Sequence, residues 1–437
     1  MEEITLSEYF RWIGLSFLVV SSYMFLGGYH VGPLSLRLLV SYGLLGYTLW
    51  RGKTDYWPTK GTRMYLFYLE FYIFISLINL NAFNFDFIKN LLVYHFVSCT
   101  AIFSFPRFFK TEASIRGAYI VLIAIFLLNA FVTYLQFHNS PLGWEIGMYI
   151  NPVKIDELEN IQSYIDNKGN YQVALLMGIM GNPVTNGYFV ATMLPIVTCY
   201  VWDNIGRKTI WTAFMFVIAG VCIFVIQQRM ALVVAAFYVF TILMFKERNY
   251  STKVFFIIAT IVLAILAIYF FQSFDISDLG RLGTIKEDEA RMGTLSVLID
   301  FLDDPRQVLI GYNRVGKEVD QYVFHTLGHN TFLDSLRRGG IFLLLVYVVL
   351  FFHLCRSLVD IVQFSHYVKD YRTKGMALGC LCYLFYSLTH SAGVQSGGIM
   401  FWTLYMLTIQ SHRVTWETIE AKETEDEKYA DVLLETV

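Results

Sequence analysis

The sequence is poor in charged residues, which make up 16% of its 437 residues, whereas soluble proteins average about 25%. Its 33 basic residues nearly balance its 35 acidic residues, and the net charge of -2 gives no reason to expect nucleic acid as a partner. Hydrophobic residues account for 56% of the chain, and the mean hydropathy is +0.50. Because only helices satisfy their own backbone in lipid, this composition predicts an all-α polytopic membrane protein.

Cysteine and basic N-terminal residues are also scarce. The six cysteines all fall in or at the ends of apolar segments, which excludes a disulfide framework and the spacing of a tetrahedral metal site. Met1 to Glu8 carries three acidic residues and no basic one, the reverse of a signal-peptide n-region. We therefore expect the first apolar segment to be retained, and we expect neither a metal nor a cofactor.

Long apolar runs dominate what is present. A helix needs about 20 residues to cross the hydrocarbon core of a bilayer. By this measure the sequence predicts about twelve transmembrane helices in a single integral membrane domain over 1–437. The expected spans are 12–29, 34–50, 64–80, 87–105, 117–137, 173–201, 209–227, 229–245, 253–271, 340–356, 375–392 and 396–412.

Lys and Arg residues of the short loops all fall on one side of these spans, which the positive-inside rule assigns to the cytoplasm. The same side holds both termini, including an acidic tail over 413–437. The other side receives a smaller loop over 138–172 and a large loop over 272–339. Within the large loop, Met292 to Leu302 has the apolar periodicity of an amphipathic helix near the membrane surface.

Three arginines on the expected outer side are candidates for binding phosphate. Arg229 stands between two spans with almost no loop, where a guanidinium could bind phosphate with two parallel hydrogen bonds or simply extend to water. Arg281 and Arg291 lie in the large loop beside acidic residues, so ordinary surface salt bridges are their alternative role. Arg337 and Arg338 are interpreted as anchors of the next span at the membrane interface.

Two polar segments interrupt the apolar pattern. Thr331 and Asp334 have the spacing of a capping box, which predicts a short helix that begins just after His329. The positive end of that helix would keep His329 neutral and able to accept a proton, although capping or packing is the simpler role for His329 and for Asn330. Asn182 and Asn186 belong to a second polar segment, Met180 to Gly187, whose alternative role is a packing kink.

Taken together, four features resemble the superfamily of O-antigen polymerases and O-antigen ligases. These are a Gly-Asn-Pro-type turn before a long span, an arginine that opens a span, an arginine-led loop helix that ends near Asp-Pro and a glycine, and His-Asn-x-x-Leu before a glycine-bearing span. The residues that carry them are Gly181, Asn182, Pro183, Asn186, Arg229, Arg291, Asp304, Pro305, Gly311, His329, Asn330, Leu333, Gly339 and Gly340. The resemblance covers about residues 175–360.

The resemblance implies a metal-independent, inverting glycosyltransferase of the bacterial inner membrane with its active site facing the periplasm. Its substrate would be an oligosaccharide carried by undecaprenyl diphosphate within the membrane lipid. By this resemblance the catalytic residues are His329, Arg229 and Arg291, and Arg281, Asn330, Asn182 and Asn186 bind substrate. The sequence does not decide whether Arg291 or Arg281 is the second contact to the diphosphate. A chain-length regulator protein is a candidate partner, and nucleic acid is not.

The preferred interpretation is a polysaccharide polymerase, of O-antigen or capsule type, which transfers the glycan onto a lipid-linked repeat unit. A ligase that transfers it to lipid A-core is the first alternative, because nothing in the sequence identifies the acceptor. A flippase or transporter of lipid-linked oligosaccharides is the second alternative. It predicts charges along a path through the spans, whereas the charges here gather in the outer loops.

Overall fold

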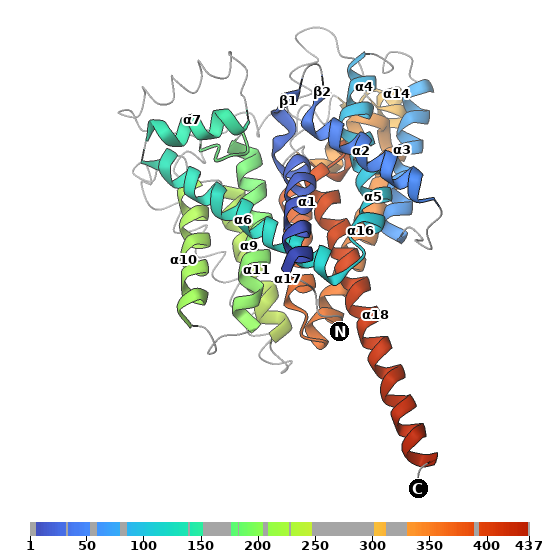
Figure 1. Ribbon diagram of the computed structural model, residues 1–437. Coiled ribbons are helices and arrows are strands. Elements are labelled where there is room, and N and C mark those ends of the chain that lie inside the picture. Colours follow the sequence, from blue (N-terminus) through green and yellow to red (C-terminus); the bar gives the residue numbers. More distant parts are fainter. Residues whose placement is uncertain are drawn as a thin grey trace.

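The computed structural model describes residues 6–31, 34–52, 59–78, 85–138, 140–151, 176–181, 183–203, 209–226, 229–246, 301–311, 330–388 and 393–435. These residues are mostly helical, and Figure 1 shows their helices packed side by side. The helices and strands are α1 (Leu6–Met24), η1 (Leu26–Gly28), β1 (His30–Val31), β2 (Leu34–Ser35), α2 (Leu36–Arg51), α3 (Lys60–Ile78), α4 (Phe85–Asn90), the π-helical turn η2 (Leu91–His95), α5 (Phe96–Phe108), α6 (Glu112–Phe137), α7 (Pro141–Ile150), α9 (Pro183–Asp203), α10 (Thr209–Ile226), α11 (Arg229–Lys246), α14 (Pro305–Ile310), α16 (Thr331–Tyr367), α17 (Tyr371–Ser387), η6 (Val394–Ser396) and α18 (Ile399–Glu435).

Different helices and strands lie at the two ends of the helix bundle. The short helices α7 and α14 and the β1–β2 hairpin all lie toward the upper end in Figure 1, with the hairpin between the two helices. Helix α1 begins toward the lower end, and α18 leaves the bundle there and continues well beyond it. The segment expected to form an acidic tail, 413–437, is therefore helical as far as Glu435.

Three helices of the described residues are long and apolar enough to cross a membrane: Phe87–Phe108, Glu112–Phe137 and Thr331–Tyr367. Val184–Cys199 and Met230–Thr241 are shorter apolar helices. These lengths suggest membrane association, but they do not confirm the expected count of about twelve spans. The expected span at 253–271 lies outside the described residues, as does the expected loop helix before Phe301.

One predicted span begins in the wrong place. The sequence predicts a helix over 173–201, but α9 begins only at Pro183. The preceding residues form a turn in which Gly178 and Gly181 have φ angles of +55° and +72°. Such angles favour glycine and interrupt a right-handed helix, so the chain turns before Pro183 opens α9.

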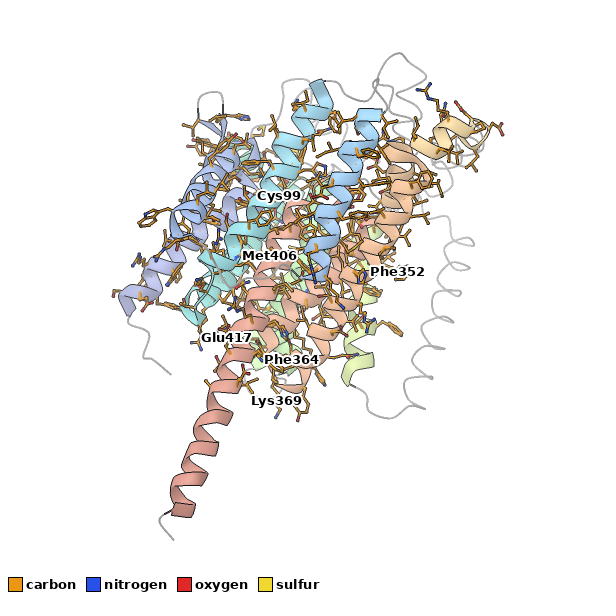
Figure 2. All side chains as sticks on the ribbon, turned by 90° about the vertical axis from the view of Figure 1, so that its right-hand side faces the viewer. Cys99, Phe352, Phe364, Lys369, Met406 and Glu417 are labelled. Atoms are coloured by element: carbon orange, nitrogen blue, oxygen red, sulfur yellow. The ribbon has the colours of Figure 1, made fainter. Side chains whose placement is uncertain are left out.

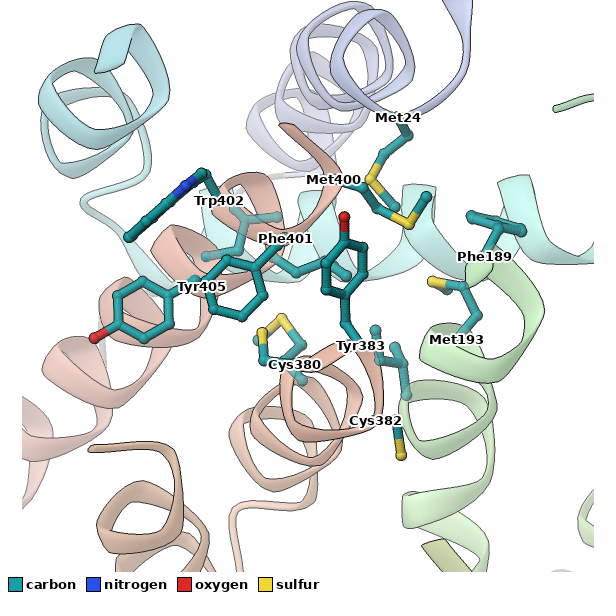
Figure 3. Packing of buried hydrophobic residues seen from close by; sticks show 14 of the residues in the cluster. Met24, Phe189, Met193, Cys380, Cys382, Tyr383, Met400, Phe401, Trp402 and Tyr405 are labelled. Atoms are coloured by element: carbon teal, nitrogen blue, oxygen red, sulfur yellow. The ribbon is translucent and has the colours of Figure 1, made fainter. Parts of the chain in front are cut away.

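The core is centred on the first turns of α18, where the helix is buried on every side. Phe401, Trp402, Leu404, Tyr405, Met406 and Leu407 are all fully buried. Figure 3 shows this part of α18 packed against α17 through Cys380 and Tyr383 and lying near Met24 of α1. A helix that is buried on every side must be surrounded by other helices, and here α17, α5, α1 and α6 surround it.

Helix α16 instead presents an apolar stripe to the outside. Phe342, Leu345, Val349 and Phe352 are about half exposed or more, and their spacing puts them on one face of the helix. Figure 2 shows Phe352 on the outer surface of the bundle. A contiguous exposed stripe of this kind is typical of a surface that contacts lipid or another protein.

Candidate functional site

Most residues of the predicted site lie outside the part of the chain that the structure describes. His329, Arg291, Arg281 and Asn182 lie outside the described residues. Arg229 is the first residue of α11, as the sequence predicts, but its side chain is likewise outside the described part. The catalytic and substrate-binding roles of these residues therefore stay predictions. Of the predicted site, Asn330 and Asn186 are described together with their side chains.

Asn330 caps the N-terminus of α16. Its side-chain Oδ1 accepts hydrogen bonds from the backbone N–H groups of Phe332 (2.8 Å) and Leu333 (3.2 Å). Its Nδ2 donates to the Leu388 carbonyl at 2.6 Å, which ties the cap to the end of α17. The expected helix thus begins directly after His329 and Asn330. These bonds favour the capping role that the sequence left open for Asn330.

The predicted capping box between Thr331 and Asp334 is wrong. Thr331 is already the first residue of α16, and the cap is Asn330, whose φ and ψ of -138° and 133° are extended. Asp334 does not reach back to the cap, because its carboxylate is engaged by two arginines of the same helix. Thr331 and Asp334 thus have the spacing of a capping box, but Asp334 instead belongs to an ion cluster.

Asp334, Arg337, Arg338 and Gln395 form this cluster, which we call the Asp334 cluster. Asp334 Oδ1 accepts from Arg337 Nη2 (2.6 Å) and Nε (3.2 Å), and Oδ2 accepts from Arg338 Nε (2.8 Å) and Gln395 Nε2 (3.2 Å). Only 1% of the Asp334 side chain is exposed, with 7% for Arg337 and 14% for Arg338. Burial at low dielectric makes each of these charge-assisted bonds strong.

The cluster corrects the interpretation of Arg337 and Arg338 as interfacial anchors. Both side chains fold back onto Asp334, one helical turn earlier, instead of extending to the membrane surface. The sequence held a usable signal, since an acid followed by bases at i+3 and i+4 is a pairing pattern on a helix. The contribution of Gln395 could not be anticipated, because it comes from η6, 61 residues away.

Aromatic residues of α3 close the other side of the cluster. The Tyr68 hydroxyl lies 3.5 Å from the Gln395 carbonyl, and the Tyr68 ring packs edge-on against Tyr347 with centroids 5.9 Å apart. Tyr72 lies beside Arg338. The charged groups are thus enclosed by tyrosines, whose hydroxyls offer polar partners and whose rings exclude water.

A backbone break directly follows the cluster. Gly339 and Gly340 have non-helical angles within α16, and Gly340 has a φ of +69°. The break separates a short helix at 331–338 from the apolar run that follows. Helix α14 packs into it: a Cβ atom on Gly311 would lie 2.6 Å from the Arg337 carbonyl oxygen, and a Cβ on Gly340 would overlap the Leu309 carbonyl. The glycines that the sequence places at the start of this span thus allow its backbone to approach the backbone of α14 closely.

His95 is a buried polar residue that the sequence analysis missed. It ends the π-helical turn η2, a geometry that is common at functional sites. Its Nδ1 lies 2.9 Å from the Tyr65 hydroxyl, within hydrogen-bond distance. Its Nε2 is buried and has no hydrogen-bond partner among the described residues. No local signal distinguishes this histidine in the sequence, because it stands within an ordinary apolar run.

Asn186 belongs to a buried amide network that holds the turn before α9. Its Oδ1 accepts from Asn129 Nδ2 at 2.8 Å, and its Nδ2 donates to the Leu176 carbonyl at 3.0 Å. Asn129 Oδ1 accepts from the Ile179 N–H, and Gln136 bonds to both the N–H and the carbonyl of Gly178. Because Asn186 is fully buried, these bonds favour the packing role that the sequence left open over substrate binding.

The large described cavity lies away from the Asp334 cluster. It has a volume of about 1730 Å³ and opens between the starts of α1 and α6, the turn between α16 and α17, and the middle of α18. Within its wall, Glu112 accepts from Arg116 at 2.8 Å and pairs with Arg372 at 2.6 Å. Asp370 caps α17 and accepts from Thr415 at 2.6 Å. These contacts join three helices.

Among the described residues, no three His, Cys, Asp or Glu side chains are grouped so that they could hold a metal ion. Neither a scan of known protein families nor a search of curated proteins finds a match to this chain. Any functional assignment therefore depends on the residues themselves.

Proposed function

We propose that this chain is a polysaccharide polymerase of the inner membrane. It transfers a glycan from undecaprenyl diphosphate to a lipid-linked repeat unit on the periplasmic side. The observation that carries the proposal is the Asn330 cap. The polar segment that resembles His-Asn-x-x-Leu opens a short helix, buried arginines follow it, and a double-glycine break then leads into an apolar helix.

In this reaction His329 acts as the general base. As the residue before the cap, it precedes the positive end of α16, which disfavours an imidazolium and keeps the ring neutral. The imidazole takes the proton of the acceptor hydroxyl while that oxygen bonds to the anomeric carbon of the donor sugar. The bond from this carbon to the diphosphate oxygen breaks in the same step, so the configuration inverts and undecaprenyl diphosphate leaves.

The leaving diphosphate requires a cationic partner. Arg229 opens α11, and Arg291 and Arg281 belong to the large loop, so the proposal assigns them to the negative charge that develops on the diphosphate. An arginine suits this role because its planar fork matches two phosphate oxygens at once. Asn182 completes the proposed substrate contacts, whereas Asn330 supports the site indirectly by capping the helix that follows His329. The amide network of Asn186 supports the turn beside Asn182.

The test is the surface polysaccharide of cells that carry variants of the gene. We expect His329→Ala to abolish chain elongation at unchanged membrane abundance, with His138→Ala, an exposed histidine at the end of α6, as the matched control. Arg229→Lys should lose most activity because a point charge cannot replace the fork. The matched control is Arg306→Lys, at an exposed position of α14. Normal long-chain polysaccharide in His329→Ala would refute the assignment of the base.

A deletion strain separates the polymerase from its alternatives. Loss of a polymerase leaves single repeat units on lipid A-core, whereas loss of a ligase leaves finished polymer on the carrier lipid. Loss of a flippase leaves the lipid-linked repeat on the cytoplasmic side, where an added periplasmic glycosidase does not reach it. The first of these three products supports the proposal, and either of the others replaces it.

A further inference from the structure

The large cavity at the end of the bundle where α18 leaves offers a binding site apart from the proposed reaction. Its volume is about 1730 Å³, and its wall combines charged side chains with apolar ones. Helix α6 contributes to this wall from Glu112 to Ile123, and it is one of the helices long and apolar enough to cross a membrane. The cavity therefore follows the end of a candidate span, where the head groups of a bilayer are found.

One face of α6 has the polarity of a lipid molecule. Arg116, Ile120 and Ile123 line the cavity at spacings of four and three residues, so they lie on one face of the helix. The basic residue is close to the start of α6, and the two half-buried isoleucines follow it along the candidate span. This order matches a phosphate head group that continues into an acyl chain.

Lys369 brings a second cation to the cavity from the turn between α16 and α17. Its φ of +61° is a left-handed value that glycine usually supplies after a helix, and no other non-glycine residue of the described chain has a positive φ. The Asp370 N–H closes the turn by donating to the Ser365 carbonyl at 2.9 Å. The lysine side chain is exposed and has no ion-pair partner within the described part of the chain. Because glycine suits this backbone better, the turn itself does not require a lysine.

Two acidic residues of the wall are occupied by bonds within the protein. Asp370 accepts four hydrogen bonds, three from the start of α17 and one from Thr415. Glu112 accepts from Arg116 and pairs with Arg372. Arg116 uses its Nε for this bond, and its side chain remains 49% exposed. The exposed basic groups of the wall are therefore Lys369 and Arg116, and both can donate to a phosphate.

The wall also carries negative charge from α1 and α18. Glu8 and Glu417 line the same cavity, and 53% of the Glu417 side chain is exposed. Glu417 Oε1 accepts from Arg413 Nε at 2.6 Å. Figure 2 shows Glu417 and Lys369 at the end of the bundle where α18 leaves it. A wall of both signs fits a head group that carries an ammonium as well as a phosphate, and it suits a purely anionic head group less well.

We propose that this cavity binds an aminophospholipid, represented by phosphatidylethanolamine. Lys369 and Arg116 donate to its phosphate, and Glu417 accepts from its ammonium group. An acyl chain packs against Ile120 and Ile123. The bound lipid joins α6, the turn after α16 and α18, and so braces the point at which α18 leaves the bundle. Binding is noncovalent, and it does not depend on the polymerase proposal.

The experiment measures which lipids the full chain binds. The purified protein in detergent is titrated by native mass spectrometry with phosphatidylethanolamine, phosphatidylcholine and phosphatidylglycerol of identical acyl chains. Phosphatidylcholine keeps both charges but has no ammonium N–H donor, and phosphatidylglycerol has no amine. We expect phosphatidylethanolamine to bind about tenfold more tightly than either, because only it forms charge-assisted hydrogen bonds at both ends of the head group. Equal binding of the three lipids, or a preference for another, overturns the proposal.

Lys369→Gly separates lipid binding from structure. Glycine suits the left-handed angle, so this variant should keep the unfolding temperature of the wild type while its affinity for phosphatidylethanolamine falls about tenfold. The matched control is Lys110→Gly, which removes an exposed lysine from the segment just before α6 and should change neither quantity. Wild-type affinity in Lys369→Gly overturns the phosphate site.

Glu417→Gln tests the contact to the ammonium group. This variant should lose the preference for phosphatidylethanolamine over phosphatidylcholine, because the amine no longer meets a carboxylate. Its affinity for phosphatidylcholine should stay as in the wild type, since the phosphate contacts are intact. Glu145→Gln, at an exposed position of α7, should keep the preference. A preference that survives in Glu417→Gln contradicts the assignment of an aminophospholipid.

Discussion

Gly340→Ala is the sharpest test of how the break in α16 and helix α14 fit together. Gly340 has a φ of +69°, which an L-residue adopts only at a cost of about 1–2 kcal/mol. An added Cβ would also overlap the Leu309 carbonyl and lie 2.6 Å from the Ile310 nitrogen. These are backbone atoms, so no side-chain rotation relieves the contact. α14 must move away from the break.

The two effects together predict a destabilisation of about 3 kcal/mol, from the backbone angle and from overpacking, which typically costs about 1–3 kcal/mol. Gly311→Ala should behave similarly, because its Cβ would meet the Arg337 carbonyl oxygen at 2.6 Å across the same contact. Once α14 has moved in response to one substitution, the Cβ atom of the second substitution has more space and costs less free energy. The double variant should therefore lose clearly less stability than the sum of the two single variants.

The assay uses cysteines that the fold protects. Cys199, Cys222, Cys380 and Cys382 are buried, so a thiol-reactive dye reports thermal unfolding of the detergent-solubilised protein. Gly46→Ala is the matched control, because a Cβ there has no neighbour within 4 Å and its backbone is helical. If Gly340→Ala unfolds at the same temperature as Gly46→Ala, the close contact between α14 and the break is refuted.

Two further substitutions test the buried polar groups by the same thiol assay. Asn186→Ala leaves the Asn129 amide without its acceptor and should cost about 2–3 kcal/mol, whereas a wild-type unfolding temperature would show that the network does not hold the turn before α9. Tyr65→Phe removes the hydroxyl beside His95 Nδ1, and the loss of a buried hydrogen bond should cost about 1–3 kcal/mol. The matched control is Tyr149→Phe, at an exposed position of α7, and equal stability of the two variants would contradict the role of Tyr65.

The sequence predicts the helical class and the position of most long helices, because apolar runs of membrane length leave the chain few other choices. The expected spans at 209–227 and 229–245 coincide with α10 and α11 to within a residue. The helix start after Asn330 was predictable for a similar reason, since capping is a local interaction. Periodicity and capping depend on neighbours in the chain, and such neighbours are visible in a sequence.

The remaining features depend on residues that are distant in the chain. Asn129 and Asn186, whose bond holds the turn before α9, are 57 residues apart, so the start of that helix could not be read from local pattern. Gln395 completes the Asp334 cluster from another turn, and the burial of Arg337 and Arg338 follows from that closure. Charges near the end of a span suggested contact with water, but packing by Gln395 and by tyrosines of α3 encloses them.

Helix α18 has a mechanical consequence. It is a single helix of 37 residues and therefore about 55 Å long. Its first turns are held by the core at Trp402 and Tyr405, and its remainder leaves the bundle. An α-helix resists twisting and bending over such a length, so it acts as a lever fixed at one end. A force or rotation applied near Glu435 is transmitted to the aromatic centre of the protein, and a label placed there would report how that centre turns.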